Sequence, residues 1–151
     1  DRPDPRAPAH APAMNASVQQ RAATLADHHA QAAHYESVLQ RCTGDVEIDA
    51  AVLATVDGMA IASVGTRAGD RAPQLGAMAS SLIAVASAAG REVGHAACER
   101  LVVQSGTGTL LIRPLGAGSA LVLCMAVPPK TVLGRALWAA DEIARTLAPR
   151  A

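Results

Sequence analysis

Residues 73–89 read PQLGAMASSLIAVASAA in one-letter code, and Gly90 follows them. Pro73 suits the first turn of a helix, because the N–H that proline lacks would have no intrahelical partner there. Gly90 is the predicted C′ residue, since glycine adopts the left-handed conformation that ends many helices. The stretch therefore predicts one long helix, around which the rest of the chain is arranged.

This helix has two faces when its residues are placed at roughly 100° intervals. We expect the larger apolar residues to face the core: Leu75, Met78, Ala79, Leu82, Val85, Ala86 and Ala89, with Ile83 at the edge. The other face carries no charge and no large side chain, and it consists of Gly76, Ala77, Ser80, Ser81, Ala84, Ser87 and Ala88. Small residues four positions apart let a second backbone come close. We expect a second copy of the helix across a two-fold axis, since symmetric dimers are the commonest oligomers; burial inside the same domain is the alternative.

The composition indicates one domain with an appendage. Half of the 151 residues are hydrophobic, but with no Phe, one Trp and one Tyr the core must consist of Ala, Leu, Val and Ile. The 13 basic and 13 acidic residues cancel, which disfavours nucleic acid and anionic membranes as partners. We judge the apolar runs too short for the ~20 residues that span a bilayer.

The N-terminal part lacks the pattern of the rest. Residues 1–13 contain four prolines and no apolar periodicity, and we interpret them as a disordered leader without the apolar core of a signal peptide. Met14 is a candidate start of translation. We assign residues 14–32 to a helical extension and 33–149 to the domain, because the stripe of Tyr35, Val38, Leu39 and Cys42 is about 100° out of register with the apolar residues before it.

Five strands are predicted around the long helix. Residues 50–56 and 59–64 form two β runs split by Asp57-Gly58, a strong signal for a type I′ hairpin. Three further runs, 101–105, 109–115 and 119–127, are separated by Gly106-Thr107-Gly108 and Gly116-Ala117-Gly118. A last helix over 131–148 completes the order α-β-β-α-β-β-β-α. This order predicts an α+β fold with a five-stranded antiparallel sheet and helices packed on it.

That order, together with AAVLATVDGMAIAS at 50–63, resembles the roadblock/LC7 family, whose fold is profilin-like. The resemblance covers most of the domain and includes the segment 79–82, Gly90-Arg91-Glu92 and the strand at 109–115. It implies a homodimer in which the middle helix and the strand Leu101–Ser105 meet a partner copy. The implied interface consists of Ala77, Ser80, Ser81, Ala84, Ser87, Ala88, Leu101 and Val103.

The resemblance also implies a function without catalysis or cofactor. Family members bind small GTPases and modulate their nucleotide cycle, or serve as scaffolds, and bacterial members pair with Ras-like GTPases. The hypothesis is therefore a cytoplasmic homodimeric regulator or adaptor that binds a Ras-like small GTPase. The alternative is a dimeric scaffold or small-molecule sensor whose partner is not a GTPase. We identify Arg67, Arg71, Arg91 and Trp138 as a possible partner surface, although ordinary solubility also explains the arginines.

The residues themselves give no sign of an active site. Neither Gly-rich turn has the Lys-Ser/Thr or the following helix of a phosphate-binding loop. His28, His29 and His34 lack the one-face spacing of metal ligands, and no nucleophile motif surrounds Ser80 or Ser81. Three widely spaced cysteines fit reduced thiols in a cytoplasm.

Overall fold

The computed structural model describes residues 19, 26–28, 30–116 and 120–148, and the chain divides into two units, 1–31 and 32–151. The leader lies outside the described residues, and so do 14–18, 20–25 and 29 of the proposed extension. The second unit contains α2 (Ala32–Cys42), β1 (Ala50–Thr55), β2 (Ala60–Val64), α3 (Ala72–Glu92), β3 (Leu101–Ser105), β4 (Gly108–Pro114), β5 (Leu121–Val127) and α4 (Leu133–Leu147). This confirms the predicted α+β fold and its element order, with boundaries within a few residues.

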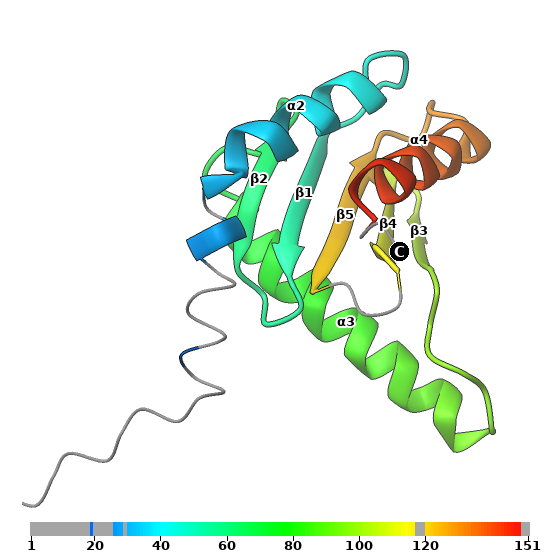
Figure 1. Ribbon diagram of the computed structural model, residues 1–151. Coiled ribbons are helices and arrows are strands. Elements are labelled where there is room, and N and C mark those ends of the chain that lie inside the picture. The colour runs from blue at the N-terminus through cyan, green and yellow to red at the C-terminus, as the bar shows by residue number, and fades with distance from the viewer. Residues whose placement is uncertain (1–18, 20–25, 29, 117–119, 149–151) are drawn as a thin grey trace, which may run out of the picture. The chain divides into compact units, whose positions relative to one another are not determined.

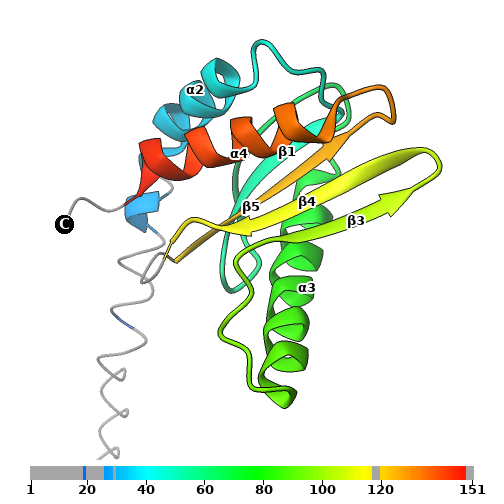
Figure 2. The same ribbon diagram turned by 90° about the vertical axis from the view of Figure 1, so that its right-hand side faces the viewer.

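The second unit has three layers. All neighbouring strands are antiparallel, and the sheet order is β2-β1-β5-β4-β3. Helices α2 and α4 cover one face of the sheet, and α3 crosses the other face (Figures 1 and 2). The strands β2 and β3 are therefore the two edges.

Strand alternation divides the interior into two cores, because successive side chains point to opposite faces. The larger core lies under α2 and α4, where Leu53, Leu123 and Met125 are fully buried. The smaller core lies under α3 and includes Val52 and Ile112. The sheet thus supports a helix layer on each side, and α3 has the smaller core beneath it.

The β1–β2 hairpin forms where Asp57-Gly58 predicts it, but with a different turn. Gly58 has φ +94°, whereas no residue other than glycine has positive φ in the described part of the chain. A type I′ turn needs positive φ at both central positions, so the predicted turn type is wrong. The N–H of Gly58 donates to the Thr55 carbonyl oxygen at 2.9 Å, and the pairing register shifts between Leu53 and Ala54. The connection between β1 and β2 therefore consists of residues 56–59 rather than of a two-residue turn, and the strand pairing beside it is irregular.

Helix α3 starts as predicted but continues past its predicted end. Pro73 lies in the first turn. Gly90 is inside the helix, and the left-handed residue is Gly94, with φ +80°. The N–H groups of Val93 and His95 both donate to the Gly90 carbonyl oxygen, at 3.1 and 2.9 Å, so this carbonyl is satisfied at the helix end. The predicted C′ position was therefore four residues too early.

By length and composition α3 could cross a membrane, so the expectation of only short apolar runs was wrong. The helix instead forms a layer of the folded domain. Ala72, Gly76, Ala79, Ser80 and Ile83 are buried against the sheet. A Cβ added at Gly76 would lie 3.1 Å from the Ala54 Cβ, so the two backbones approach closely there.

Candidate dimerisation face and partner surfaces

The side of α3 turned away from the sheet is exposed and uncharged. We call it the outer face, and it consists of Ala77, Met78, Ser81, Leu82, Ala84, Val85, Ala88 and Ala89. Met78 is 60% exposed and Val85 is 67% exposed, which is high for large apolar side chains. Contiguous exposed apolar surface of this kind marks interaction sites.

The predicted assignment of the two helix faces was wrong in part. Met78, Leu82 and Val85 were expected in the core but are exposed, whereas Gly76 and Ser80 were expected on the opposite face but are buried. The physical reason is the close approach to the sheet, which leaves room for a narrow stripe of small residues and Ile83 rather than for the longest side chains.

Two predicted interface serines are used within the subunit. The Ser80 hydroxyl donates to the Val56 carbonyl oxygen, which closes the gap between α3 and the β1–β2 turn. Ser87 is half-buried, and its hydroxyl oxygen accepts a hydrogen bond from the Cys98 N–H at 3.1 Å. Four other predicted helix residues do lie on the outer face: Ala77, Ser81, Ala84 and Ala88.

Strand β3 is an open edge of the sheet. It pairs with β4 alone, so its other side presents backbone N–H and C=O groups without a strand partner in the second unit. Leu101 is half-buried and packs in the core under α3, while Val103, on the same strand face, is 41% exposed. Both residues of the predicted strand contact therefore lie on the sheet face that α3 covers.

The segment between α3 and β3 connects the C-terminal end of α3 to this edge. The Ser87–Cys98 hydrogen bond ties the segment to the C-terminal half of α3, and Cys98 packs with Leu101 against the smaller core. The segment that leads into the open edge is thus held against α3 within one subunit.

The three arginines of the predicted partner surface lie at opposite ends of α3. Arg67 and Arg71 precede the helix and Arg91 lies in its last turn; all three side chains are exposed. A helix of 21 residues is about 30 Å long, so the two groups are well separated in one subunit. Trp138 is 60% exposed on α4, the layer on the other side of the sheet. One subunit therefore does not bring all four residues into a single surface.

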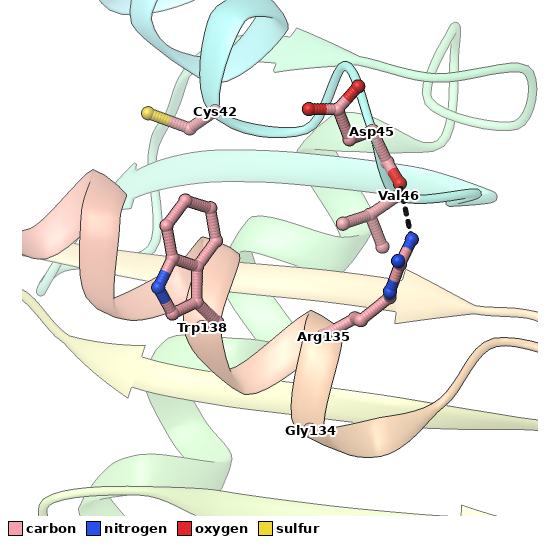
Figure 3. A pocket seen from close by; sticks show the side chains of 6 residues that line it. All are labelled: Cys42, Asp45, Val46, Gly134, Arg135 and Trp138. Carbon is pink, nitrogen blue, oxygen red and sulfur yellow. Dashed lines mark hydrogen bonds between the residues drawn. The ribbon is translucent and has the colours of Figure 1, made fainter.

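Trp138 borders a hollow of about 520 Å³ between α4 and the loop after α2. Figure 3 shows its six lining residues, with the Asp45 carboxylate and the Trp138 indole on facing sides. The hollow is lined by Cys42, Asp45, Val46, Gly134, Arg135 and Trp138. The sequence pattern pointed to Trp138 but not to Asp45 and Arg135, which only the fold brings together.

Asp141 links α4 to the β3–β4 side of the sheet. Its carboxylate accepts a hydrogen bond from Arg100 at 3.0 Å and another from Arg113. Arg113 is three-quarters buried at its side chain, and Asp141 therefore compensates a charge that water reaches poorly. No periodicity in the sequence predicts this ion-pair cluster, because its members are up to 41 residues apart.

The ionisable groups in the described residues do not gather into a reaction centre. Burial raises the pKa of the Cys124 thiol to about 11, so this thiol is protonated at neutral pH. Cys98 is half-buried, with its Sγ 3.3 Å from the Arg100 carbonyl oxygen. Within the described ranges no three His, Cys, Asp or Glu side chains lie where they could hold one metal ion.

Comparison with known proteins identifies the family. The family model described as Roadblock/LC7 domain matches residues 34–124, which are 91 of the 151 residues. This chain belongs to the roadblock/LC7 family. No curated protein sequence matches it.

Solved structures share the fold of this roadblock/LC7 chain at low sequence identity. Myxococcus xanthus MglB has a TM-score of 0.64 at 20% identity, over 75% of this chain and 94% of that one. The gliding protein MglB of Thermus thermophilus has a TM-score of 0.68 at 18% identity, over 79% of this chain and 89% of that one. Acanthamoeba castellanii profilin IA has a TM-score of 0.53 at 17% identity, over 75% and 95% of the two chains. The likeness to profilin agrees with the predicted fold class.

Proposed function

We propose that this roadblock/LC7 protein is a cytoplasmic, non-enzymatic homodimer that binds a Ras-like small GTPase and modulates its nucleotide cycle. The observation that carries the proposal is the outer face of α3 beside the open edge of β3. Membership of the family supports the GTPase as partner, because the family resemblance implies that class.

Antiparallel pairing of β3 with its copy gives the dimer its geometry. The two-fold axis of such a pair is perpendicular to the sheet, and it therefore leaves both α3 helices on one face of a continuous sheet. The two α3 helices then lie side by side, and the flanks of their outer faces that border the axis are covered. Alanine and serine at 77, 81, 84 and 88 allow the helices to approach closely.

The same axis turns the two α3 helices antiparallel. Arg67 and Arg71 of one subunit then lie toward the end of the helix pair that carries the partner subunit's Arg91. Each end of the platform then carries three arginines against Asp70 and Glu92, which leaves a small excess of basic side chains, and these suit acidic groups on a docking protein. The GTPase surface that docks here is accordingly expected to be acidic at its rim.

Ala84→Arg tests the dimer, because it places a charge in the middle of the helix contact, where no acidic residue of the outer face can pair with it. We expect the mass from light scattering to fall from a dimer to a monomer. Thr146→Arg is the matched control, since Thr146 is exposed on α4, and it should stay dimeric. A wild-type monomer, or a dimer that Ala84→Arg leaves intact, would contradict the proposed interface.

Binding to small GTPases tests the partner. Wild-type protein and Ala84→Arg are mixed with Ras-like GTPases encoded near its gene, each loaded with GDP or with a GTP analogue. We expect the wild type to bind one of them and to change its hydrolysis or exchange rate, whereas Ala84→Arg loses binding. If no GTPase binds a proven dimer, the alternative of a scaffold or small-molecule sensor is favoured. The hollow beside Trp138 is the observation that supports that alternative.

A further inference from the structure

The hollow beside Trp138 lies on the side of the sheet opposite the proposed dimer face, so a ligand bound in it is independent of the proposed function. Its volume of about 520 Å³ is within the range of small-molecule sites, which are roughly 300–1,000 Å³. Val46 and the Trp138 ring supply apolar surface, and Figure 3 shows both turned toward the space between α4 and the loop after α2. Gly134 has no side chain to fill the hollow, and the space beside its Cα is empty, since a Cβ there would meet nothing within 4 Å.

Two opposite charges border this hollow without forming an ion pair in the described part of the chain. The Arg135 guanidinium reaches the Asp45 backbone carbonyl oxygen at 3.4 Å, not the Asp45 carboxylate. Other charges nearby are paired: Lys130 with Glu47, and Arg145 with Glu142. Asp45 and Arg135 therefore have a carboxylate oxygen and guanidinium N–H groups available to a ligand.

Each of the two charged residues lies near a helix end, and the local helix dipole favours a ligand group of opposite charge there. Asp45 follows the C-terminal end of α2, which favours a cation, and Arg135 lies in the first turn of α4, which favours an anion. No side chain caps the first turn of α4. A ligand that complements both ends needs a positive group toward Asp45 and a negative group toward Arg135.

We propose that the hollow binds a small zwitterion of the α-amino-acid class, with an ammonium group, a carboxylate and an apolar body. The ammonium group donates to the Asp45 carboxylate and lies near the Trp138 ring, whose face attracts cations. The ligand carboxylate accepts from Arg135, whose planar fork matches carboxylate geometry. The apolar body packs against Val46 and the indole.

Trp138 makes the proposal directly measurable, because it is the one tryptophan of the chain. L-Leucine is the probe, and intrinsic fluorescence of the full-length protein is the readout. We expect a saturable change of emission at millimolar concentration or below. Leucinamide keeps only the ammonium group and N-acetyl-leucine only the carboxylate, so each should bind at least about tenfold more weakly.

Charge-removing variants test the assignment of each end. Asp45→Asn should weaken L-leucine binding about tenfold or more, and so should Arg135→Gln. Glu47→Gln is the matched control for the loop and Arg145→Gln for the helix; both residues lie outside the hollow and should keep wild-type affinity. Far-ultraviolet circular dichroism establishes that all four variants fold.

Several results would overturn the proposal. These are unchanged emission up to about 10 mM L-leucine, equal binding of leucinamide, or equal affinity of the variants and their controls. A Trp138 signal that only the GTPase produces would instead identify the hollow as part of a protein contact. Because dimerisation is measured separately with Ala84→Arg, either proposal can fail without the other.

Discussion

At the scale of single residues, the close contacts of this domain depend on glycines that no other residue can replace without strain. Gly65 ends β2 with φ +112°, and a Cβ there would lie 2.7 Å from the Asp49 carbonyl oxygen. L-residues avoid this conformation, and the contact is with backbone that cannot easily move. The positive φ and the short backbone contact therefore both disfavour a side chain at Gly65.

Gly65→Ala is therefore expected to lower the free energy of unfolding by about 2–3 kcal/mol. Gly69→Ala is the matched control, since Gly69 lacks positive φ and a Cβ there meets nothing within 4 Å. The control should stay within about 0.5 kcal/mol of wild type. Urea denaturation of both variants measures the difference, and equal stabilities would show that the loop after β2 relaxes freely.

Cys124 makes a prediction about pH, because burial raises its pKa from 9.0 to about 11. The native state then holds the thiol proton at pH values where the unfolded chain has lost it. Stability from this group is therefore present below pH 9 and falls as the pH rises toward 11, by about 2 kcal/mol at the upper end.

The comparison of wild type with Cys124→Ala isolates that effect. The variant has a lower free energy of unfolding at neutral pH, but the difference between the two proteins should shrink from pH 9 to pH 11. Burial also raises the pKa of Tyr35, which both proteins share, so its contribution cancels. A difference that stays constant over this range would contradict the raised pKa of Cys124.

At the scale of elements, the faces of α3 decide what each of its residues does. Ile83 is buried in the core under α3, whereas its neighbour Leu82 is 39% exposed on the outer face. Ile83→Ala should cost about 2–4 kcal/mol, since it leaves a cavity against the sheet. Leu82→Ala should cost less than about 1 kcal/mol in the monomer. Denaturation in the Ala84→Arg background, where dimerisation does not contribute, provides this comparison.

The order of elements could be predicted from sequence, because each boundary has a local cause. Asp57-Gly58 and Gly106-Thr107-Gly108 divide alternating apolar runs, and Pro73 starts the long helix. The orientation of α3 could not be predicted in the same way. Periodicity predicts that the face with the larger side chains is buried. The face that packs on the sheet is instead the one with Gly76 and Ser80, because these small residues allow α3 to approach β1 and β2 closely.

The partner surfaces show a similar limit. The uncharged character of the α3 face was visible in the sequence, and four of its six predicted interface residues lie on the outer face. The hollow beside Trp138 was not visible, because Asp45 and Arg135 are 90 residues apart and only the packing of the loop after α2 against α4 brings them together. Long-range juxtaposition of this kind leaves no local pattern.

At the scale of the whole molecule, one subunit has apolar surface that a second copy would cover. Its outer face has large exposed side chains, and its β3 edge has backbone groups without a strand partner among the described residues. If the dimer is the functional state, association stabilises the folded chain by mass action, because the unfolded chain has no such interface. The free energy of unfolding should then increase with the fraction of protein that is dimeric.

The wild type should accordingly melt at a higher temperature as protein concentration rises, whereas Ala84→Arg should melt at one temperature throughout. Scanning calorimetry over a hundredfold concentration range, about 1–100 µM, makes the comparison, with Thr146→Arg expected to follow the wild type. At the lowest concentrations the wild type and Ala84→Arg should converge, because Ala84 is exposed in the monomer and its substitution costs little there. A wild-type melting temperature independent of concentration would mean either that the subunit is monomeric or that the dimer does not dissociate on unfolding, and light scattering of the same samples distinguishes the two.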